Sequence, residues 1–276
     1  MTPVRIRYRF VLPDGSRETF DLFFDANNFQ ILNPHPAPLP FWTELAFNQC
    51  ENCPLKAAEH PHCPVAVQLV AVIERLERLV SYDQVRVDVH TVERVVSQET
   101  TAQQALSSLL GLIMATSGCP RTEFLRSMAR FHLPLASEHE TIFRAASSYA
   151  LAQMLQAAGG APPDAAFQGL KAAYAELHKV NRGIAKRISA AARNDPARNA
   201  VVLLDAYTTL LPNAIDQSLA EMHPLFAAVP GATPRADAVA APADATVAPT
   251  QEAAARTGEA AGSTEENVTA ETTPSQ

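Results

Sequence analysis

The four cysteines of this chain are the residues whose type and spacing point most directly to chemistry. Cys50 and Cys53 form a CxxC pair, Cys63 follows soon after, and Cys119 lies in a remote Ser-Gly-Cys-Pro segment. A CxxC pair completed by two further cysteines is typical of a site in which four thiolates bind one metal centre. The sequence therefore predicts a metal site formed by Cys50, Cys53, Cys63 and Cys119.

The metal itself stays open between Zn²⁺ and a 4Fe-4S cluster, because four thiolates satisfy either one. Proline follows Cys53, Cys63 and Cys119, and a ligand followed by proline is a feature of some iron–sulfur clusters. Proline after an N-cap residue is equally ordinary at a helix start, which explains two of the three. The competing interpretations are four unrelated thiols, a CxxC redox pair with two buried cysteines, or a site in which His60 or His62 replaces one cysteine.

Arginines, histidines and carboxylates crowd together further along the chain, in the region of Arg130, His132 and His139. Such a group can form an acid–base or anion-binding site. A structural interpretation competes with it, because Ser137 and Glu140 fit a capping box and Glu140 is four residues before an arginine. His132 has no such explanation.

Asn181 is a further candidate, because it is the polar position in an otherwise apolar helical seam that runs from Leu170 to Ile188. A buried polar group must find partners or cost about 1 to 3 kcal/mol. Asn181 therefore fixes the helix register or lines a functional cavity. With it, the candidate cofactor- or ligand-binding residues are Arg130, His132, His139 and Asn181; the sequence identifies no catalytic residue.

The elements that must position these residues begin with strands. Residues 4–12 alternate apolar and arginine side chains at period two, which predicts a strand with one solvated face. An Asp-Gly turn connects it to the next strand. Pro64 fits the first position of a helix, with Cys63 as its N-cap. The expected order is β-β-β-α-β, with strands at 4–12, 17–24 and 29–32, a helix at 65–80 and a strand from 85.

From residue 101 onward the apolar periodicity is helical. The predicted fold class is therefore α+β, with a small antiparallel β-sheet packed against an α-helical bundle and a disordered C-terminal tail. We expect one composite domain over 1–228, in which 1–100 is the β-rich part with the cysteine loop and 101–228 is the helical part. The expected helices are 101–116, 120–131, 138–158, 163–193, 196–211 and 213–226.

Composition and charge restrict the classes of partner. The chain has 276 residues and a net charge of −7, and such an acidic balance argues against nucleic acid as the main partner. Residues 229–276 are rich in Ala, Thr, Pro and Glu with almost no large apolar side chain, which predicts disorder. The chain has no apolar run of the length that a membrane helix needs and no secretory signal pattern. We therefore expect a cytoplasmic protein, where cysteines are ligands or free thiols rather than disulfides.

Several segments together resemble an uncharacterised bacterial family known only as a domain of unknown function. They are Cys-Glu-Asn-Cys-Pro-Leu at 50–55, Cys-Pro-Val-Ala at 63–66, Ser-Gly-Cys-Pro at 117–120 and Met-Ala-Arg-Phe-His-Leu-Pro at 128–134. The resemblance covers about residues 3 to 228 and carries over no catalytic residue. It implies one composite unit in which the cysteines and the Arg-Phe-His stretch are the distinctive parts.

The sequence shows no nucleotide loop, nucleophile elbow or paired carboxylates at a familiar spacing. The leading hypothesis is a regulatory or adaptor protein, not an enzyme, in which a structural zinc centre joins the sheet to the helices and an unidentified protein is the partner. The alternative hypothesis is an iron–sulfur-containing redox or sensor protein.

Overall fold

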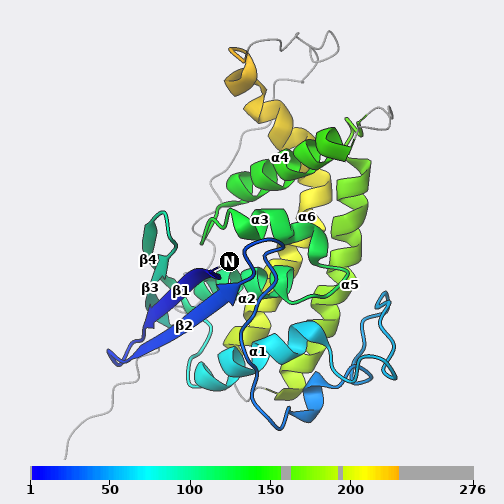
Figure 1. The fold of residues 1–276 in the computed structure, drawn as a ribbon. Coiled ribbons are helices and arrows are strands. Elements are labelled where there is room, and N and C mark those ends of the chain that lie inside the picture. The colour runs from blue at the N-terminus through cyan, green and yellow to red at the C-terminus, as the bar shows by residue number, and fades with distance from the viewer. Residues whose placement is uncertain (1, 157–162, 192–194, 230–276) are drawn as a thin grey trace, which may run out of the picture. The chain divides into compact units, whose positions relative to one another are not determined.

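The computed structural model describes residues 2–156, 163–191 and 195–229, and Figure 1 shows how the strands and helices are arranged. The predicted tail therefore lies outside the described residues, apart from Val229. The described part combines a four-stranded antiparallel sheet with six α-helices, which confirms the predicted α+β class.

The sheet has the strand order β2-β1-β3-β4. Its strands are β1 (Val4–Val11), β2 (Arg17–Phe24), β3 (Gln84–His90) and β4 (Val95–Thr101), and every neighbouring pair is antiparallel. Tyr8 pairs with Phe20 on one side and with Val89 on the other. The alternation along β1 therefore places Ile6, Tyr8 and Phe10 in the core, as the period-two pattern predicts.

The order of elements within the β-rich part is β-β-α-β-β, not the expected β-β-β-α-β. The stretch predicted as a third strand makes only an isolated bridge, between Phe24 and Ile31. The missing strand is β4, which returns from β3 after a turn at residues 91–94. Its sequence, Val-Val-Ser-Gln-Glu-Thr-Thr, is polar because β4 is an edge strand with mostly exposed side chains, so it gives little apolar signal.

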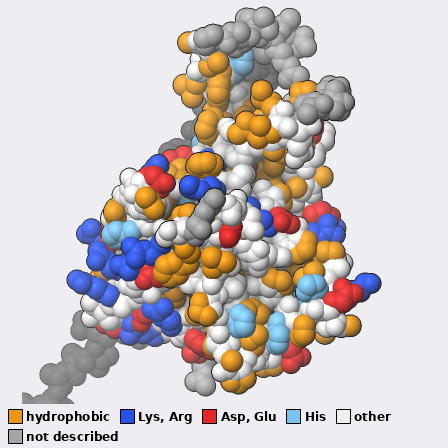
Figure 2. All heavy atoms as spheres, in the orientation of Figure 1, with side chains coloured by type: hydrophobic (Ala, Val, Ile, Leu, Met, Phe, Trp, Pro, Cys, Tyr) orange, Lys and Arg blue, Asp and Glu red, His pale blue; other side chains and the backbone are white. Residues whose placement is uncertain are grey.

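The arginines of β1 lie on the solvated face of the sheet and are paired with aspartates. The Arg7 guanidinium lies 2.8 Å from the Asp21 carboxylate, and Arg9 lies 2.5 Å from Asp88. In Figure 2 blue side chains gather over the sheet, with red ones among them. These pairs explain the arginines as a charge-balanced sheet face rather than as an anion-binding surface.

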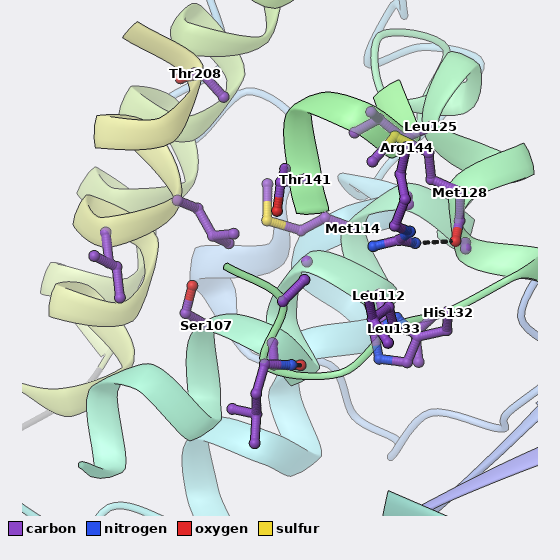
Figure 3. A pocket seen from close by; sticks show the side chains of 18 of the residues that line it. Ser107, Leu112, Met114, Leu125, Met128, His132, Leu133, Thr141, Arg144 and Thr208 are labelled. Atoms are coloured by element: carbon purple, nitrogen blue, oxygen red, sulfur yellow. Dashed lines mark hydrogen bonds between the residues drawn. The ribbon is translucent and has the colours of Figure 1, made fainter. Parts of the chain in front are cut away.

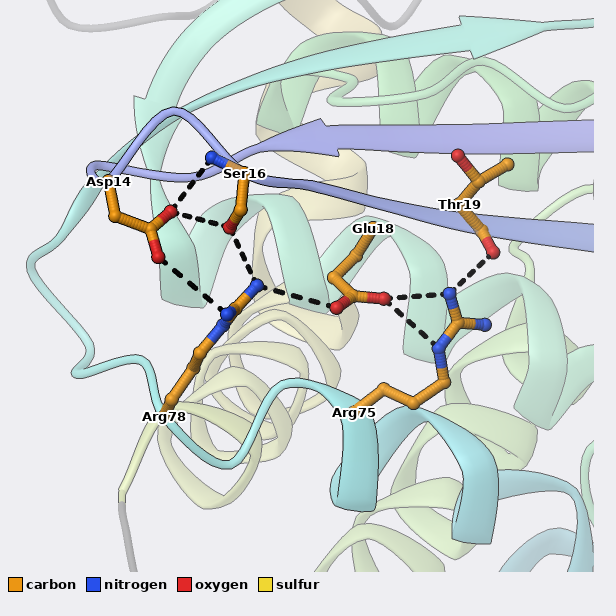
Figure 4. A network of polar contacts seen from close by, with 6 residues as sticks. All are labelled: Asp14, Ser16, Glu18, Thr19, Arg75 and Arg78. Atoms are coloured by element: carbon orange, nitrogen blue, oxygen red, sulfur yellow. Dashed lines mark hydrogen bonds and ion pairs between the residues drawn. The ribbon is translucent and has the colours of Figure 1, made fainter.

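Helix α1 (Pro64–Arg75) begins as predicted, with Cys63 as N-cap and proline at the first turn. Its C-terminal end is attached to the β1–β2 hairpin by a polar network, shown in Figure 4. Arg75 donates 2.7 Å to the Glu18 carboxylate and 2.9 Å to the Thr19 carbonyl. Arg78 donates 2.7 Å to the Ser16 hydroxyl. The contacts hold the hairpin against the helix that begins at a cysteine.

The helical part contains α2 (Ala102–Thr116), α3 (Arg126–Arg130), α4 (Glu138–Gln156), α5 (Gln168–Ala191) and α6 (Pro196–Met222). The capping box is present: the Ser137 amide donates to Glu140 at 2.7 Å, and the Glu140 amide to Ser137 at 3.3 Å. Two expected helices merge into α6, which continues through Pro212. The helix expected from Pro120 is a turn, a short 3-10 segment and then α3, so Cys119 does not cap an α-helix.

Helix α6 packs against both α2 and α5, and α2 also contacts strands β3 and β4. The residues of α2 are almost all buried, including Leu106, Leu109 and Ile113. Helix α2 is thus the layer between the sheet and the other helices. No helix within the described part of the chain is long and apolar enough to cross a membrane.

Candidate functional site

The CxxC pair lies on a loop whose two ends are closed together. The Leu45 amide donates to the Pro61 carbonyl at 2.8 Å, and the Cys63 amide donates to the Thr43 carbonyl at 2.7 Å. Within the loop, the Cys53 amide donates to the Cys50 carbonyl at 3.0 Å, which makes the CxxC a tight turn. The loop therefore returns the chain to its starting point with Cys63 placed at the start of α1.

Cys119 reaches the same region from the end of α2. Gly118, at φ +87°, turns the chain into the Cys119 segment with a backbone conformation that favours glycine. Two residues after that cysteine, Arg121 donates from Nε to the Asn52 carbonyl, inside the CxxC turn, at 2.7 Å. This bond attaches the remote cysteine segment to the CxxC turn.

Helix α5 lies directly against the CxxC turn. A Cβ atom added at Gly183 would lie 2.6 Å from the Cys50 Sγ atom, so only glycine fits there. One turn earlier on the same face, the Cys50 thiol donates weakly to the Val180 carbonyl at 3.9 Å. The Asn52 amide donates to both the carbonyl and the carboxylate of Glu176, each at 2.9 Å. One face of α5 therefore supports the cysteine loop along its length.

The four cysteines are near enough to interact electrostatically. The pKa of the Cys50 thiol is raised to about 12, mainly by burial and further by the charges of Cys63, Cys119 and Cys53. Burial also raises the pKa of Cys63 and of Cys119. Backbone amides oppose this rise at both positions, at the start of α1 and in the turn after Cys119. Burial therefore favours the neutral thiols of Cys63 and Cys119, whereas the neighbouring backbone amides favour their thiolates.

Arg187 is the cation beside this group. Its side chain is 1% exposed and donates to the carbonyls of Trp42, Glu44 and Leu45 at 2.6–2.8 Å. Its charge lowers the pKa of Cys50, although burial outweighs that effect. Among the described residues Arg187 has no carboxylate partner within ion-pair distance, and its Nε–H lacks a hydrogen-bond acceptor.

Within the described residues, no group of three or more His, Cys, Asp or Glu side chains is arranged to hold a metal ion. The four thiols are free, with Cys63 and Cys119 buried and the other two partly buried. They are therefore neighbours without coordination geometry, and the metal site at Cys50, Cys53, Cys63 and Cys119 stays a prediction. Neither His60 nor His62 completes such a group; His62 instead contacts the Thr43 hydroxyl at 2.9 Å.

A second candidate site is a cavity of about 260 Å³ inside the helical part. Figure 3 shows side chains that converge on it from several elements, with Arg144 extending toward Met128. It is lined by parts of α2, α3, α4, α5 and α6, by the loop after α3, and by Gln98 and Gln104 at an exposed edge. Most of the lining is apolar, which is typical of small-molecule sites.

This cavity brings together two of the four candidate ligand-binding residues, His132 and Asn181. It does not include His139, which is exposed and lies 3.4 Å from Glu221 on α6. Nor does it include Arg130, which is exposed and stacks at 5.6 Å over the ring of Phe29. Of the three candidate residues that lie close together in the sequence, His132 is therefore partly buried beside the cavity, whereas Arg130 and His139 are on the surface.

His132 is part of a closed hydrogen-bond network under the sheet. The Tyr8 hydroxyl lies 2.5 Å from His132 Nε2 and 2.8 Å from the Ser108 hydroxyl. Burial, and secondarily the charge of Arg144, lowers the pKa of His132 to about 3. The histidine is therefore neutral near pH 7, and its ring nitrogen is occupied by a protein partner, which makes it a structural neighbour of the cavity.

Three functional residues escape the sequence analysis. Arg187 follows Ile184 by three residues, so a cation on the apolar face of α5 was a readable signal. Gly183 lies on that face as well, but the need for glycine arises only from the approach of a loop remote in sequence. Arg144 is four residues after Glu140, and the charges of the two residues interact; its hydrogen bonds, however, go to the carbonyls of Met128 and Phe131, which the sequence does not indicate.

None of the curated proteins matches this chain, and none of the solved structures does either. The chain does match one family model, over residues 6–227. That range includes the four cysteines, α5 and the whole lining of the cavity. The match confirms the resemblance seen in the sequence, and the chain therefore belongs to the family described as domain of unknown function DUF6901.

Proposed function

We propose that this protein is a regulatory or adaptor protein in which Cys50, Cys53, Cys63 and Cys119 bind one structural zinc ion. The ion would join the cysteine loop and the start of α1 to the segment after α2. With four thiolate ligands a tetrahedral zinc ion has no position left for substrate, which favours a structural role over a catalytic one.

The observation that carries this proposal is Arg187. A guanidinium remains charged in proteins, and a buried charge is costly unless it is paired. The described residues offer Arg187 three carbonyls but no carboxylate within ion-pair distance. Its charge lowers the pKa of the thiols of Cys50 and Cys63. A zinc ion with four thiolates carries a net charge of about −2, and would supply the anion that this buried cation lacks.

The cost of ionising the thiols supports the same conclusion. Burial opposes thiolate formation at Cys50, Cys63 and Cys119, so these groups would stay protonated without a cation. Metal binding displaces the protons and requires the thiolate form. The amides at the start of α1 and after Cys119 then stabilise the anionic sulfurs.

The test is metal analysis of the full chain purified without oxygen, together with its visible absorption spectrum. We expect about one zinc ion per chain and no colour. If the chain instead contains several irons and acid-labile sulfide, the centre is an iron–sulfur cluster, and the redox or sensor hypothesis is supported. The three Cys-Pro pairs are compatible with such a cluster. A purified chain with neither metal, which also fails to retain added zinc, would overturn the proposal.

Substitutions test the ligand set. Cys119→Ser is the most informative, because it removes the ligand from the remote segment, and we expect zinc retention to fall at least tenfold. His60→Ala and His62→Ala are the matched controls from the same loop and should retain zinc as the natural protein does. Equal zinc retention in the Cys119→Ser protein would exclude the four-cysteine site.

A further inference from the structure

The cavity is lined by a cation, Arg144, that has no carboxylate within ion-pair distance among the described residues, although its charge acts on Glu140 from further away. Arg144 projects from α4, and its guanidinium donates to the Met128 carbonyl at 2.6 Å and to the Phe131 carbonyl at 3.2 Å. The nearest acidic residue on its helix, Glu140, is engaged by Ser137 in the capping box. No ion pair within 4.0 Å joins Arg144 to an acidic residue in the described part of the chain. The other two nitrogens of the Arg144 guanidinium, Nε and Nη1, have no hydrogen-bond partner among the described residues and can donate to an anion in the cavity.

A buried hydroxyl lies beside this cation. Tyr174, on α5, is 4% exposed, and its hydroxyl contacts only the Met128 thioether, at 3.9 Å, among the described residues. A thioether is a weak acceptor, so the hydroxyl retains its capacity to donate. Arg144 and Tyr174 both line the cavity and both contact Met128, through its carbonyl and its thioether respectively, so they lie on the same part of the wall. The other buried tyrosine of this region, Tyr8, is already engaged by Ser108 and His132.

The remaining walls suit a hydrocarbon body. Met114 and Met128 lie on opposite elements, α2 and α3, and Leu112, Leu133 and Leu204 add aliphatic surface. Methionine adapts its shape to irregular ligands. A volume of about 260 Å³ is slightly below the usual range for ligand pockets. At about 30 Å³ for each water-sized group, it holds a molecule of roughly nine non-hydrogen atoms.

We propose that this cavity binds a small amphipathic monocarboxylate, with its carboxylate on Arg144 and Tyr174 and its hydrocarbon chain against Met114 and Met128. A carboxylate can accept a charge-assisted hydrogen bond from the part of the Arg144 guanidinium that the carbonyls leave open, and a second hydrogen bond from the Tyr174 hydroxyl. The inference is independent of the proposed zinc ion, because none of the four cysteines lines the cavity.

Octanoate, which has an eight-carbon chain and one carboxylate, is the probe. The chain has five methionines, so the full protein labelled with ¹³C in the methionine methyl groups reports on the cavity directly. Octanoate should shift the Met114 and Met128 signals in a saturable way and leave those of Met154 and Met222 unchanged. Octan-1-ol, which has the same chain without the charge, should bind at least tenfold more weakly.

The variant Arg144→Gln removes the charge, and it should weaken octanoate binding at least tenfold while it leaves octan-1-ol binding unchanged. Arg130→Gln is the matched control, because Arg130 is on the adjacent helix α3 but outside the cavity. It should bind octanoate as the natural protein does. If Arg144→Gln fails to fold, the affinities of the natural protein for octanoate and octan-1-ol still test whether the cavity recognises the carboxylate.

Two results would overturn the inference. One is that the Met114 and Met128 signals do not shift when octanoate is added, up to the concentration at which the Met154 and Met222 signals begin to shift. The other is equal affinity for octanoate and octan-1-ol, which would show an apolar cavity without anion recognition. Zinc content, measured on the same samples, should stay constant throughout, so failure of this inference is distinguishable from failure of the zinc proposal.

Discussion

Two arginines, Arg187 on α5 and Arg144 on α4, donate to backbone carbonyls in different surroundings. Arg187 is sealed in the protein beside the cysteines and donates to three backbone carbonyls. Arg144 reaches toward α5 from α4, is only partly buried and donates to two carbonyls at the wall of a cavity. Neither has a carboxylate within ion-pair distance among the described residues.

The difference in burial between Arg187 and Arg144 determines which kind of anion can bind each guanidinium. A sealed cation must be neutralised by groups that fold with it, and the charge of Arg187 lowers the pKa of the thiols of Cys50 and Cys63. A cation on an accessible cavity can exchange water for a ligand. The cysteine side of α5 is therefore interpreted as a permanent structural centre and the cavity side as a reversible binding site.

The largest effect should come from Arg187→Met, which removes the buried charge and leaves the carbonyls of Trp42, Glu44 and Leu45 without their donor. We expect a loss of about 3–5 kcal/mol in the free energy of unfolding. Urea unfolding followed by the fluorescence of Trp42, the single tryptophan, measures it. Arg182→Met, on the exposed side of the same helix, is the control and should change stability by under about 0.5 kcal/mol. Equal effects of the two variants would contradict the distinction.

A pair of glycines compares the two sides at the level of packing. Gly183→Ala places a Cβ atom 2.6 Å from Cys50 Sγ, and we expect it to cost about 1–3 kcal/mol. Gly111→Ala, at the cavity, meets its nearest neighbour, Leu204 Cδ2, at 3.4 Å. Because alanine is the better helix former by about 1 kcal/mol, this variant should be neutral or slightly stabilising. Thermal unfolding of both proteins checks the prediction, and a destabilised Gly111→Ala protein would show that the cavity wall is as tight as the cysteine side.

The dependence of stability on pH should report His132. Its pKa in the folded protein is about 3, against 6.5 for an ordinary histidine, so the unfolded chain binds a proton that the folded one rejects. This contribution to stability is complete above pH 6.5 and is lost as the pH falls toward 3, at about 1.4 kcal/mol per pH unit. In His132→Gln, the free energy of unfolding should depend less steeply on pH between 6.5 and 3 than in the natural protein. His139→Gln, at an exposed position, should keep the steeper dependence. Comparison with the natural protein at each pH cancels any release of zinc by acid.

The smallest effect on stability should come from Tyr174→Phe. The hydroxyl that it removes is buried with only a thioether for a partner, so its loss should change the free energy of unfolding by under about 0.5 kcal/mol. Octanoate binding should nevertheless weaken severalfold, because one donor to the carboxylate is lost. A marked loss of stability would mean that the hydroxyl has a structural partner and is not held for a ligand.

Local signals in the sequence predicted much of the fold. The strand pattern at residues 4–12, the Cys63-Pro64 helix start and the Ser137–Glu140 capping box are each set by neighbours in the chain, and all three are present. Strand β4 was missed because its exposed edge position removes the apolar alternation. The helix predicted to begin at Pro120 is absent there, because hydrogen bonds from Thr122 to the Cys119 and Met114 carbonyls hold that segment in a turn.

The sites depend on contacts between distant segments, and the sequence predicted less of them. The cysteine spacing predicted a shared site, which stays a prediction, and the cation that lowers the pKa of Cys50 comes from a helix that lies more than 60 residues after the last cysteine. His132 and Asn181 were found because each was unexplained locally, and both line the cavity. Arg144 and Tyr174 each had a local explanation, as an ion-pair partner and as a core residue, so only their tertiary neighbours reveal them.

X-ray absorption at the zinc edge of the metal-loaded full chain tests the central claim most directly. We predict four sulfur ligands at about 2.3 Å from zinc, with no nitrogen or oxygen ligand, and a loss of one sulfur or of the metal in Cys119→Ser. A coordination shell with nitrogen or oxygen at about 2.0–2.1 Å, or a protein that retains no zinc, would contradict the account, since Arg187 would then lie buried without the anion that we assign to it.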